Sequence, residues 1–237
     1  MNSRGSLWAN IPPVTKHLLI INFLMWLATI VLQRTAAFDL QDWLGLHYWR
    51  ASDFNAAQLV TYMFMHDSSG IAHVFFNMFS LWMFGGIIER SMGVKRFLFY
   101  YLSCGIGAGL VQELTWEFSL AEMVAAVEAG RTVIDATGSI ITYNDFITVG
   151  ASGAVFGILL AFGYMFPNMR MYVIPFPFPI KAKWMVLGYG VVELLFGVSG
   201  TMDTVAHFAH LGGMIFGFII LWYWRHKGAI GRDNGYY

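Results

Sequence analysis

Long apolar runs separated by short polar segments dominate the hydropathy pattern of this 237-residue chain. A helix that crosses a hydrocarbon core of about 30 Å needs roughly 20 apolar residues. Six runs approach or reach that length, near residues 17–34, 70–89, 95–115, 148–167, 183–199 and 203–224. The pattern therefore predicts an all-α polytopic membrane protein, with six transmembrane helices packed as a bundle.

The composition agrees with a membrane protein and excludes other classes. Apolar residues make up 57% of the chain and charged residues 12%, against about 25% charged residues in soluble domains. The formal net charge is zero and no basic patch is interleaved with aromatic residues, so nucleic acid is not an expected partner. Cys104 is the single cysteine, which excludes an intrachain disulfide.

The distribution of Lys and Arg predicts the orientation of the helices. Eleven of the fourteen cations fall on one side of the six predicted spans, which by the positive-inside rule makes both termini cytoplasmic. Residues 1–16 and 225–237 are then short cytoplasmic tails around a membrane domain at 17–224. The first run ends without a clear cleavage site, so we interpret it as an anchor. The compact chain leads us to expect the inner membrane of a bacterium.

Four polar residues within the predicted spans fall at a similar depth. His73 and Asn77 lie early in the second span, Ser152 early in the fourth and His210 early in the sixth. These three helices run in the same direction, which places all four residues within roughly 5–12 Å of the outer boundary at 1.5 Å per residue. Polar groups in lipid are costly and usually functional. The shared depth predicts one site.

Two glycine patterns offer a way to bring the helices together. Gly153 and Gly157 in the fourth span, and Gly213 and Gly217 in the sixth, have the GxxxG spacing that allows close approach in lipid. We therefore expect the hydroxyl of Ser152 to lie within hydrogen-bond reach of His210 in the sixth span.

The residue types at this depth are typical of acyl transfer. A serine hydroxyl needs a base to become a nucleophile, and His210 is suited to that task near neutral pH. His73, Asn77 and the backbone N–H of Ser152 at a helix N-terminus can donate to an oxyanion. No acidic residue occupies an obvious third place, so the sequence predicts a Ser–His dyad.

The same residues form motifs that resemble those of the rhomboid intramembrane serine proteases. The resemblance covers nearly the whole chain. It is carried in order by Trp49-Arg50 in the first loop, by HVFFN at residues 73–77, by GASG at 150–153 and by AHLGGMIFG at 209–217.

The resemblance implies a six-helix endopeptidase that cleaves transmembrane segments of other proteins near the extracytoplasmic face. It assigns Ser152 as nucleophile, His210 as general base, and His73, Asn77 and the Ser152 backbone as the oxyanion hole. Many members carry Tyr four residues after the serine, where this chain has Phe156. The fifth helix, often assigned as a lateral gate in the family, corresponds to residues 184–199.

Three other functions compete with proteolysis. A zinc site could use His73, His207 and His210, but no HExxH is present and the last two, at i and i+3, lack a nearby carboxylate ligand in the sequence. A catalytically silent rhomboid-like protein would bind transmembrane clients without cutting them. A transporter is disfavoured because Glu193 is nearly alone as a charge within the spans, and we assign Glu193 no role beyond packing or gating.

The sequence thus predicts an enzyme without a cofactor or metal. Its expected partners are membrane lipid and transmembrane protein substrates, and the oligomeric state is left open. Because water must reach Ser152 for hydrolysis, we also expect a hydrated cavity that opens toward the extracytoplasmic side.

Overall fold

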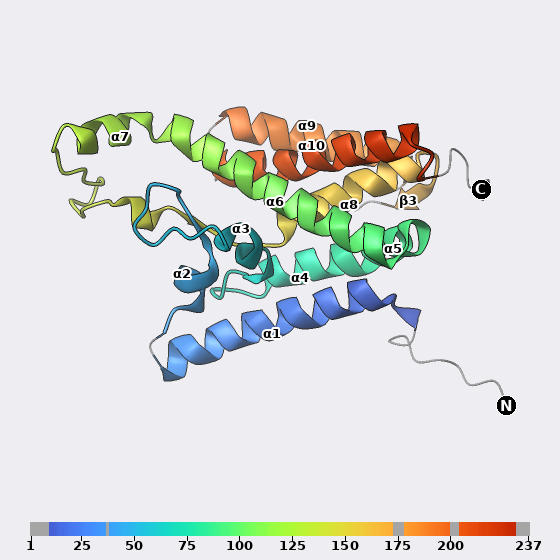
Figure 1. Ribbon diagram of the computed structural model, residues 1–237, viewed down its shortest axis with the longest axis horizontal. Coiled ribbons are helices and arrows are strands. Elements are labelled where there is room, and N and C mark those ends of the chain that lie inside the picture. Colours follow the sequence, from blue (N-terminus) through green and yellow to red (C-terminus); the bar gives the residue numbers. More distant parts are fainter. Residues whose placement is uncertain (1–9, 37, 173–177, 200–203, 231–237) are drawn as a thin grey trace.

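The computed structural model describes residues 10–36, 38–172, 178–199 and 204–230. Its longer helices run roughly along one common axis, and α1 begins at the same end of the bundle at which α10 ends (Figure 1). The longer helices are α1 (Pro13–Thr35), α4 (Ala72–Ser80), α5 (Gly86–Met92), α6 (Val94–Ser119), α8 (Ser152–Met165), α9 (Ala182–Ser199) and α10 (Thr204–His226).

The helices lie where the apolar runs predict them, so the protein is an all-α polytopic membrane protein. Among the described residues, four helices are long and apolar enough to cross a membrane: α1, α6, α9 and most of α10. The second predicted span is built from α4, a π-helical stretch (Leu81–Gly85, η3) and α5 in direct succession. Helix α8 has 14 residues and is about 21 Å long, so the number of full spans stays a prediction.

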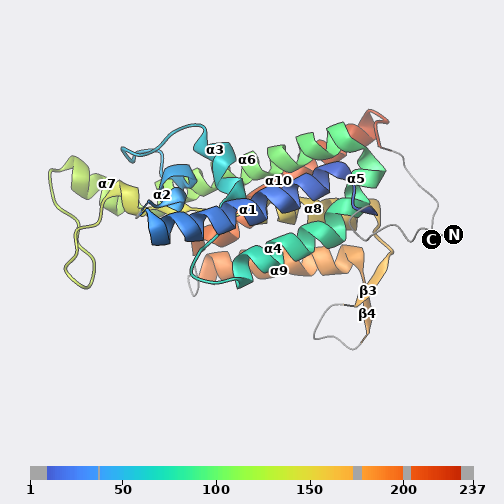
Figure 2. The same cartoon turned by 90° about the horizontal axis from the view of Figure 1, so that it is seen from below.

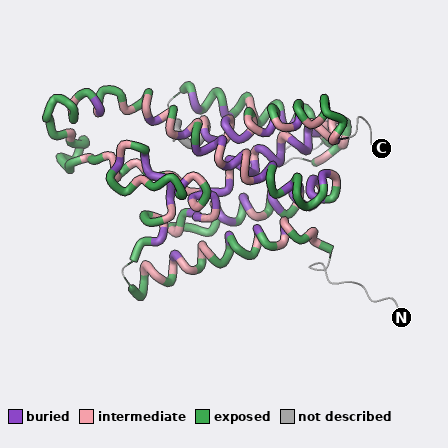
Figure 3. The backbone as a smooth tube through the Cα atoms, in the orientation of Figure 1, coloured by how far each residue is buried: buried purple, intermediate pink, exposed green. Residues whose placement is uncertain are grey.

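Helix α6 lies at the centre of the bundle and packs against both α8 and α10. Its buried face includes Tyr100, Tyr101 and Cys104. Figure 3 shows the buried residues concentrated where these helices meet, with exposed residues along the outer faces that would contact lipid. The Tyr100 hydroxyl donates to the carbonyl of Gly157 over 2.7 Å, which satisfies both polar groups inside the core.

Glycine allows α8 and α10 to touch backbone to backbone. A Cβ added to Gly213 would overlap the carbonyl oxygen of Gly153, and one added to Gly153 would overlap Ala108 of α6. Side chains larger than hydrogen would therefore push these helices apart, as expected for close helix crossings in lipid. This crossing holds the start of α8 against the first turns of α10.

Helix α1 is tied to the bundle by a buried carboxylate. The side chain of Glu89 in α5 accepts hydrogen bonds from the N–H of Val14 at 2.9 Å and from the N–H and hydroxyl of Thr15, both at 2.7 Å. These groups belong to the first turn of α1, whose N–H groups have no partner within the helix. Glu89 therefore caps α1 from a neighbouring helix.

Smaller elements gather at the opposite end of the bundle from that cap (Figures 1 and 2). Strand β1 (Leu46–His47) pairs antiparallel with β2 (Ile147–Thr148) and joins the two long loops. The carboxylate of Glu117 accepts from Tyr48, Trp49 and Arg50. The remaining short helices here are α2 (Leu40–Leu44), α3 (Gln58–Thr61), α7 (Ala121–Glu128) and two 3-10 turns, η2 (Tyr62–Phe64) and η4 (Tyr143–Asp145).

Between α8 and α9 the chain forms a hairpin. Strand β3 (Arg170–Tyr172) pairs antiparallel with β4 (Pro179–Lys181), and Arg170 lies opposite Lys181. The proline-rich segment between them, for which its prolines predict a turn, includes residues 173–177, which lie outside the described residues.

Candidate active site

Ser152 is the first residue of α8 and follows a glycine that the turn requires. Gly150 has a φ of 137°, a conformation open to glycine and strained for other residues. A Cβ at that position would lie 3.0 Å from Nε2 of His73. The N–H of Gly150 donates to the carbonyl of Tyr62 over 3.0 Å, which fixes the turn against η2. The serine is thereby held at a helix N-terminus, where N–H groups and the helix dipole favour negative charge.

His210 of α10 lies directly beside this serine. Its Nε2 is 2.8 Å from the Oγ of Ser152, within hydrogen-bond distance. The ring of Phe156, one turn further along α8, stacks on the imidazole with 4.3 Å between centroids and 8° between planes. The aromatic surface expected at position 156 is therefore present against the histidine, without a hydroxyl.

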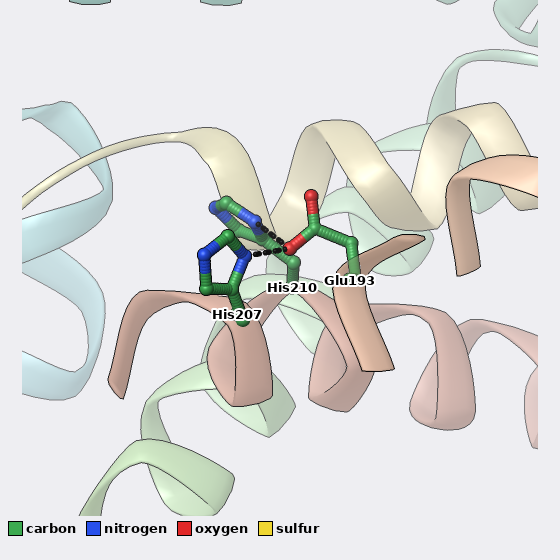
Figure 4. Close-up of side chains that lie close together, drawn as sticks. All are labelled: Glu193, His207 and His210. Carbon is green, nitrogen blue, oxygen red and sulfur yellow. Dashed lines mark hydrogen bonds and ion pairs between the residues drawn. The ribbon is translucent and has the colours of Figure 1, made fainter. Parts of the chain in front are cut away.

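An acidic side chain lies beside His210, where the sequence showed no obvious acid. Oε2 of Glu193 in α9 is 3.0 Å from Nδ1 of His210 and 2.6 Å from Nδ1 of His207. Figure 4 shows both rings directed at this one carboxylate oxygen. The expectation that no acid lies beside His210 is wrong because it considered each helix separately, whereas the packing of the consecutive helices α9 and α10 brings Glu193 to the histidines.

His73 and Asn77 lie one turn apart on α4. Asn77 is buried, and its Nδ2 donates to the carbonyl of His73 over 3.1 Å. The backbone N–H of Asp67 donates to Nδ1 of His73 over 3.4 Å. A neutral imidazole that accepts at Nδ1 carries its proton on Nε2, which is the nitrogen that faces Gly150. The geometry therefore leaves His73 with a donor directed at the turn before Ser152.

All four predicted residues line one cavity of about 760 Å³ between α4, α8, α9 and α10. The remaining wall is largely apolar and aromatic, and includes Phe76, Phe156 and Tyr189. A mostly apolar cavity with a few convergent polar groups is typical of a ligand or substrate site. The similar depth of the four residues in the sequence thus corresponds to a shared cavity in space.

The residues that could bind zinc in the structure differ from those that the sequence suggested. His73 does not join the other two histidines, but Glu193 does: in the part of the chain that the structure describes, one oxygen of Glu193 and one nitrogen each of His207 and His210 lie within 4.8 Å of one another. The expectation that no carboxylate lies near His207 and His210 is therefore wrong. However, a nitrogen–oxygen distance of 2.6 Å is typical of a hydrogen bond, whereas two ligands of a tetrahedral zinc lie roughly 3.3 Å apart.

His66 is a buried histidine behind the site, and the sequence predicted no role for it. His66 is fully buried, and its ring meets the ring of His73 edge-on at 5.1 Å. Burial, with His73 nearby, lowers the pKa of His66 to about 3. A neutral ring at this place supports His73 by packing rather than by charge.

Comparison with known proteins assigns the family. Residues 48–227 match the family model of the Rhomboid domain, which is more than half of the chain. The chain therefore belongs to the rhomboid family, and is an integral multi-pass membrane protein of that class.

Individual relatives are distant but span several kinds of membrane. The chain is 28% identical to "Rhomboid protein 1, mitochondrial" of Saccharomyces cerevisiae over 64% of this chain and 37% of the relative. It is 28% identical to "Rhomboid protease GluP" of Bacillus subtilis over 68% of this chain and 24% of the relative. For "Rhomboid-like protein 11, chloroplastic" of Arabidopsis thaliana the identity is 27%, over 70% and 51%. The chain thus spans about a quarter to a half of the length of these relatives.

Proposed function

We propose that this protein is an intramembrane serine endopeptidase that cleaves transmembrane segments of other membrane proteins near the extracytoplasmic face. In this proposal Ser152 is the nucleophile and His210 the general base. His73, Asn77 and the backbone N–H of Ser152 form the oxyanion hole, and no cofactor takes part. Membership of the rhomboid family supports an intramembrane protease.

The observation that carries the proposal is the contact between Oγ of Ser152 and Nε2 of His210 at 2.8 Å. A hydroxyl is a weak nucleophile until a neighbouring base accepts its proton. In the cavity, this hydrogen bond orients a lone pair of Oγ toward the space in which a substrate carbonyl would lie.

The first half of the reaction acylates the serine. The proton of Ser152 moves to Nε2 of His210 while Oγ bonds to the carbonyl carbon, and the carbonyl π electrons move onto the oxygen. As this intermediate collapses, the bond from carbon to nitrogen breaks, and the leaving amine takes the proton from His210. An ester between Ser152 and the N-terminal fragment of the substrate remains.

Charge on the oxygen requires donors that are already in place. Nε2 of His73 carries a proton because Nδ1 accepts from the backbone of Asp67. Asn77 has a second amide hydrogen beside the one that bonds the carbonyl of His73. Together with the N–H of Ser152, these groups supply three donors from two helices.

Hydrolysis of the ester repeats the proton transfers with water. His210 takes a proton from water, the hydroxide oxygen attacks the ester carbon, and Ser152 regains the proton when the ester bond breaks. Water must therefore enter the cavity, and we propose that it does so from the extracytoplasmic side.

The length of α8 supports cleavage near one face of the membrane. This helix runs from Ser152 toward the end of the bundle at which α10 ends (Figure 1). Its length of about 21 Å is shorter than the hydrocarbon core of about 30 Å. Ser152 would then lie roughly 10 Å below the opposite surface, which the distribution of Lys and Arg assigns to the extracytoplasmic side.

Cleavage of a single-pass transmembrane protein in liposomes tests the proposal. Purified wild-type protein and Ser152→Ala are compared with the same substrate, and a fluorophosphonate measures the reactivity of the serine. We expect cleavage and labelling by the wild type and neither by the variant. We use a panel of substrates, each with small residues in a transmembrane helix that unwinds easily. The result then does not depend on the sequence of one substrate.

Three other results would contradict the proposal. Equal cleavage by both proteins would remove Ser152 as the nucleophile. Loss of activity with a chelator, restored by zinc, would favour a metal enzyme. Tight binding of transmembrane segments across the panel, with no cleavage and no labelling, would favour the catalytically silent client-binding function.

A further inference from the structure

Glu193 is the single acidic residue of α9, and its carboxylate lies behind the histidine of the site. The residue is 9% exposed. Its Oε2 contacts two imidazoles of α10, at 2.6 Å for His207 and 3.0 Å for His210. A carboxylate in the hydrocarbon region is costly unless it is paired, and it is functional more often than not. The structure pairs this one with the histidine that contacts Ser152.

The contact determines which nitrogen of His210 is free to act as a base. An ionised carboxylate can only accept hydrogen bonds, so the Nδ1 atoms that face it carry protons and donate. A neutral His210 with its proton on Nδ1 has a lone pair on Nε2, the atom 2.8 Å from the hydroxyl of Ser152. The tautomer required for proton abstraction is thus the one that Glu193 selects.

Contacts on the ring of His210 define its orientation completely. Phe156 covers one face in a nearly parallel stack, Glu193 binds one edge nitrogen, and Ser152 binds the other. His207 in turn donates to the same oxygen of Glu193 and packs against the ring of Phe196 at 5.5 Å. The carboxylate is therefore held by two hydrogen bonds. A rotation of the Glu193 side chain away from His210 would break both of them.

We infer that Glu193 is a positioning residue for His210, and that Ser152, His210 and Glu193 work as a triad supported by His207. This inference rests on the proposed function. When His210 takes the proton of Ser152 it becomes an imidazolium, and the adjacent carboxylate stabilises that charge most where water is scarce. No proton passes to Glu193: His210 holds the proton taken from Ser152 until the leaving amine accepts it, and Glu193 stays ionised.

The test separates catalysis from the structural tie between α9 and α10. Three variants are compared in liposomes: Glu193→Gln keeps an acceptor but removes the charge, Glu193→Asp keeps the charge on a shorter arm, and Glu193→Ala removes both. Glu122→Gln, the same change at an exposed position of α7, is the matched control. For each protein, kcat and KM for a transmembrane substrate, the rate of fluorophosphonate labelling and the melting temperature are measured.

We expect kcat and the labelling rate to fall together while KM stays within about twofold. A positioned acid–base group contributes roughly 10²–10⁴-fold to the rate, so Glu193→Ala is expected to lose on the order of 10²-fold and Glu193→Gln on the order of 10-fold. Glu193→Asp should recover part of the loss seen with Ala, and Glu122→Gln should match the wild type. A small fluorophosphonate reaches Ser152 without a transmembrane segment entering between helices, so its rate reports activation of the hydroxyl.

Four results would overturn the inference, and the first and third of them leave the proposed function intact. If KM or the melting temperature changes while the labelling rate of Glu193→Gln and Glu193→Ala stays at the wild-type value, Glu193 only ties α9 to α10. If wild-type cleavage is lost with a chelator and restored by zinc, the three side chains hold a metal. If Ser152→Ala abolishes cleavage but all Glu193 variants match the wild type, the proposed protease function is retained and the positioning role of Glu193 is rejected. If the wild type itself neither cleaves nor labels, both fall.

Discussion

Two buried carboxylates, Glu89 and Glu193, join neighbouring helices at different places in this bundle and have different kinds of partner. Glu89 accepts from two backbone N–H groups and a threonine hydroxyl, none of which titrates near neutral pH. Glu193 accepts from two imidazoles, one of which contacts Ser152. The partners therefore separate a carboxylate that caps a helix from one that can support proton transfer.

Each of the two regions accommodates its buried carboxylate for a different reason. At Glu89 the carboxylate satisfies donors that a helix N-terminus always leaves free. The contact between Glu89 and α1 is therefore explained by stability alone. At Glu193 the carboxylate, the two histidines and the serine form a chain of hydrogen bonds next to a cavity. Such networks are expensive in lipid and persist where they serve chemistry.

The largest effect is expected at the crossing of α8 and α10, which holds the start of α8 against α10. Gly213→Ala places a methyl group on the carbonyl of Gly153, and overpacking of this kind costs about 3 kcal/mol of the free energy of unfolding. Because the crossing holds Ser152 beside His210, kcat should also fall on the order of 10²-fold. Unfolding in detergent and cleavage in liposomes measure the two losses.

Gly188→Ala in α9 is the matched control for that change. A Cβ at Gly188 meets no atom within 4 Å, so the same substitution should leave stability and activity unchanged. Equal losses in the two variants would contradict the role given to the α8–α10 crossing.

A loss of stability without a loss of catalysis is expected at Glu89. Glu89→Ala leaves three donors of α1, two of them buried, without their acceptor, which should cost about 2 kcal/mol of the free energy of unfolding. Glu89→Gln keeps one oxygen as acceptor and should cost less. The kcat of the folded fraction, normalised by active-site labelling, should equal that of the wild type.

The result at Glu89 has a direct counterpart at Glu193, for which kcat rather than stability should change. If Glu89→Ala lowered the normalised kcat as much as Glu193→Ala does, partner type would not distinguish the two carboxylates.

The effect that is smallest at neutral pH is a dependence of stability on pH from His66. Its pKa is lowered to about 3 in the folded protein by burial and by His73, against about 6.5 in the unfolded chain. Between these values the unfolded chain binds a proton that the folded protein does not, so stability should decrease as pH falls from about 6.5 toward 3. Melting temperatures of the wild type and His66→Met over this range test the effect, which the variant should reduce. An identical pH dependence in both would contradict it.

Much of the fold could be predicted from the sequence because lipid imposes simple rules on a helix. The apolar runs predicted the segments that form α1, α6, α9 and α10, since each must satisfy its own backbone and face hydrocarbon. The boundaries were less predictable: α8 is shorter than its apolar run, because Gly150 turns the chain just before Ser152. The π-helical stretch in the second span left no signal in the hydropathy pattern.

For the candidate site, the sequence by itself determined which residues could take part, and tertiary structure decided how they connect. Ser152, His210, His73 and Asn77 were evident because polar residues at one depth in lipid are rare and costly. Glu193 was visible as an intramembrane acid, but its partners were not, since periodicity describes one helix at a time. Its contact with His210 exists because α9 packs beside α10, and which faces of two neighbouring helices meet depends on how their side chains pack, which the hydropathy of each helix does not describe.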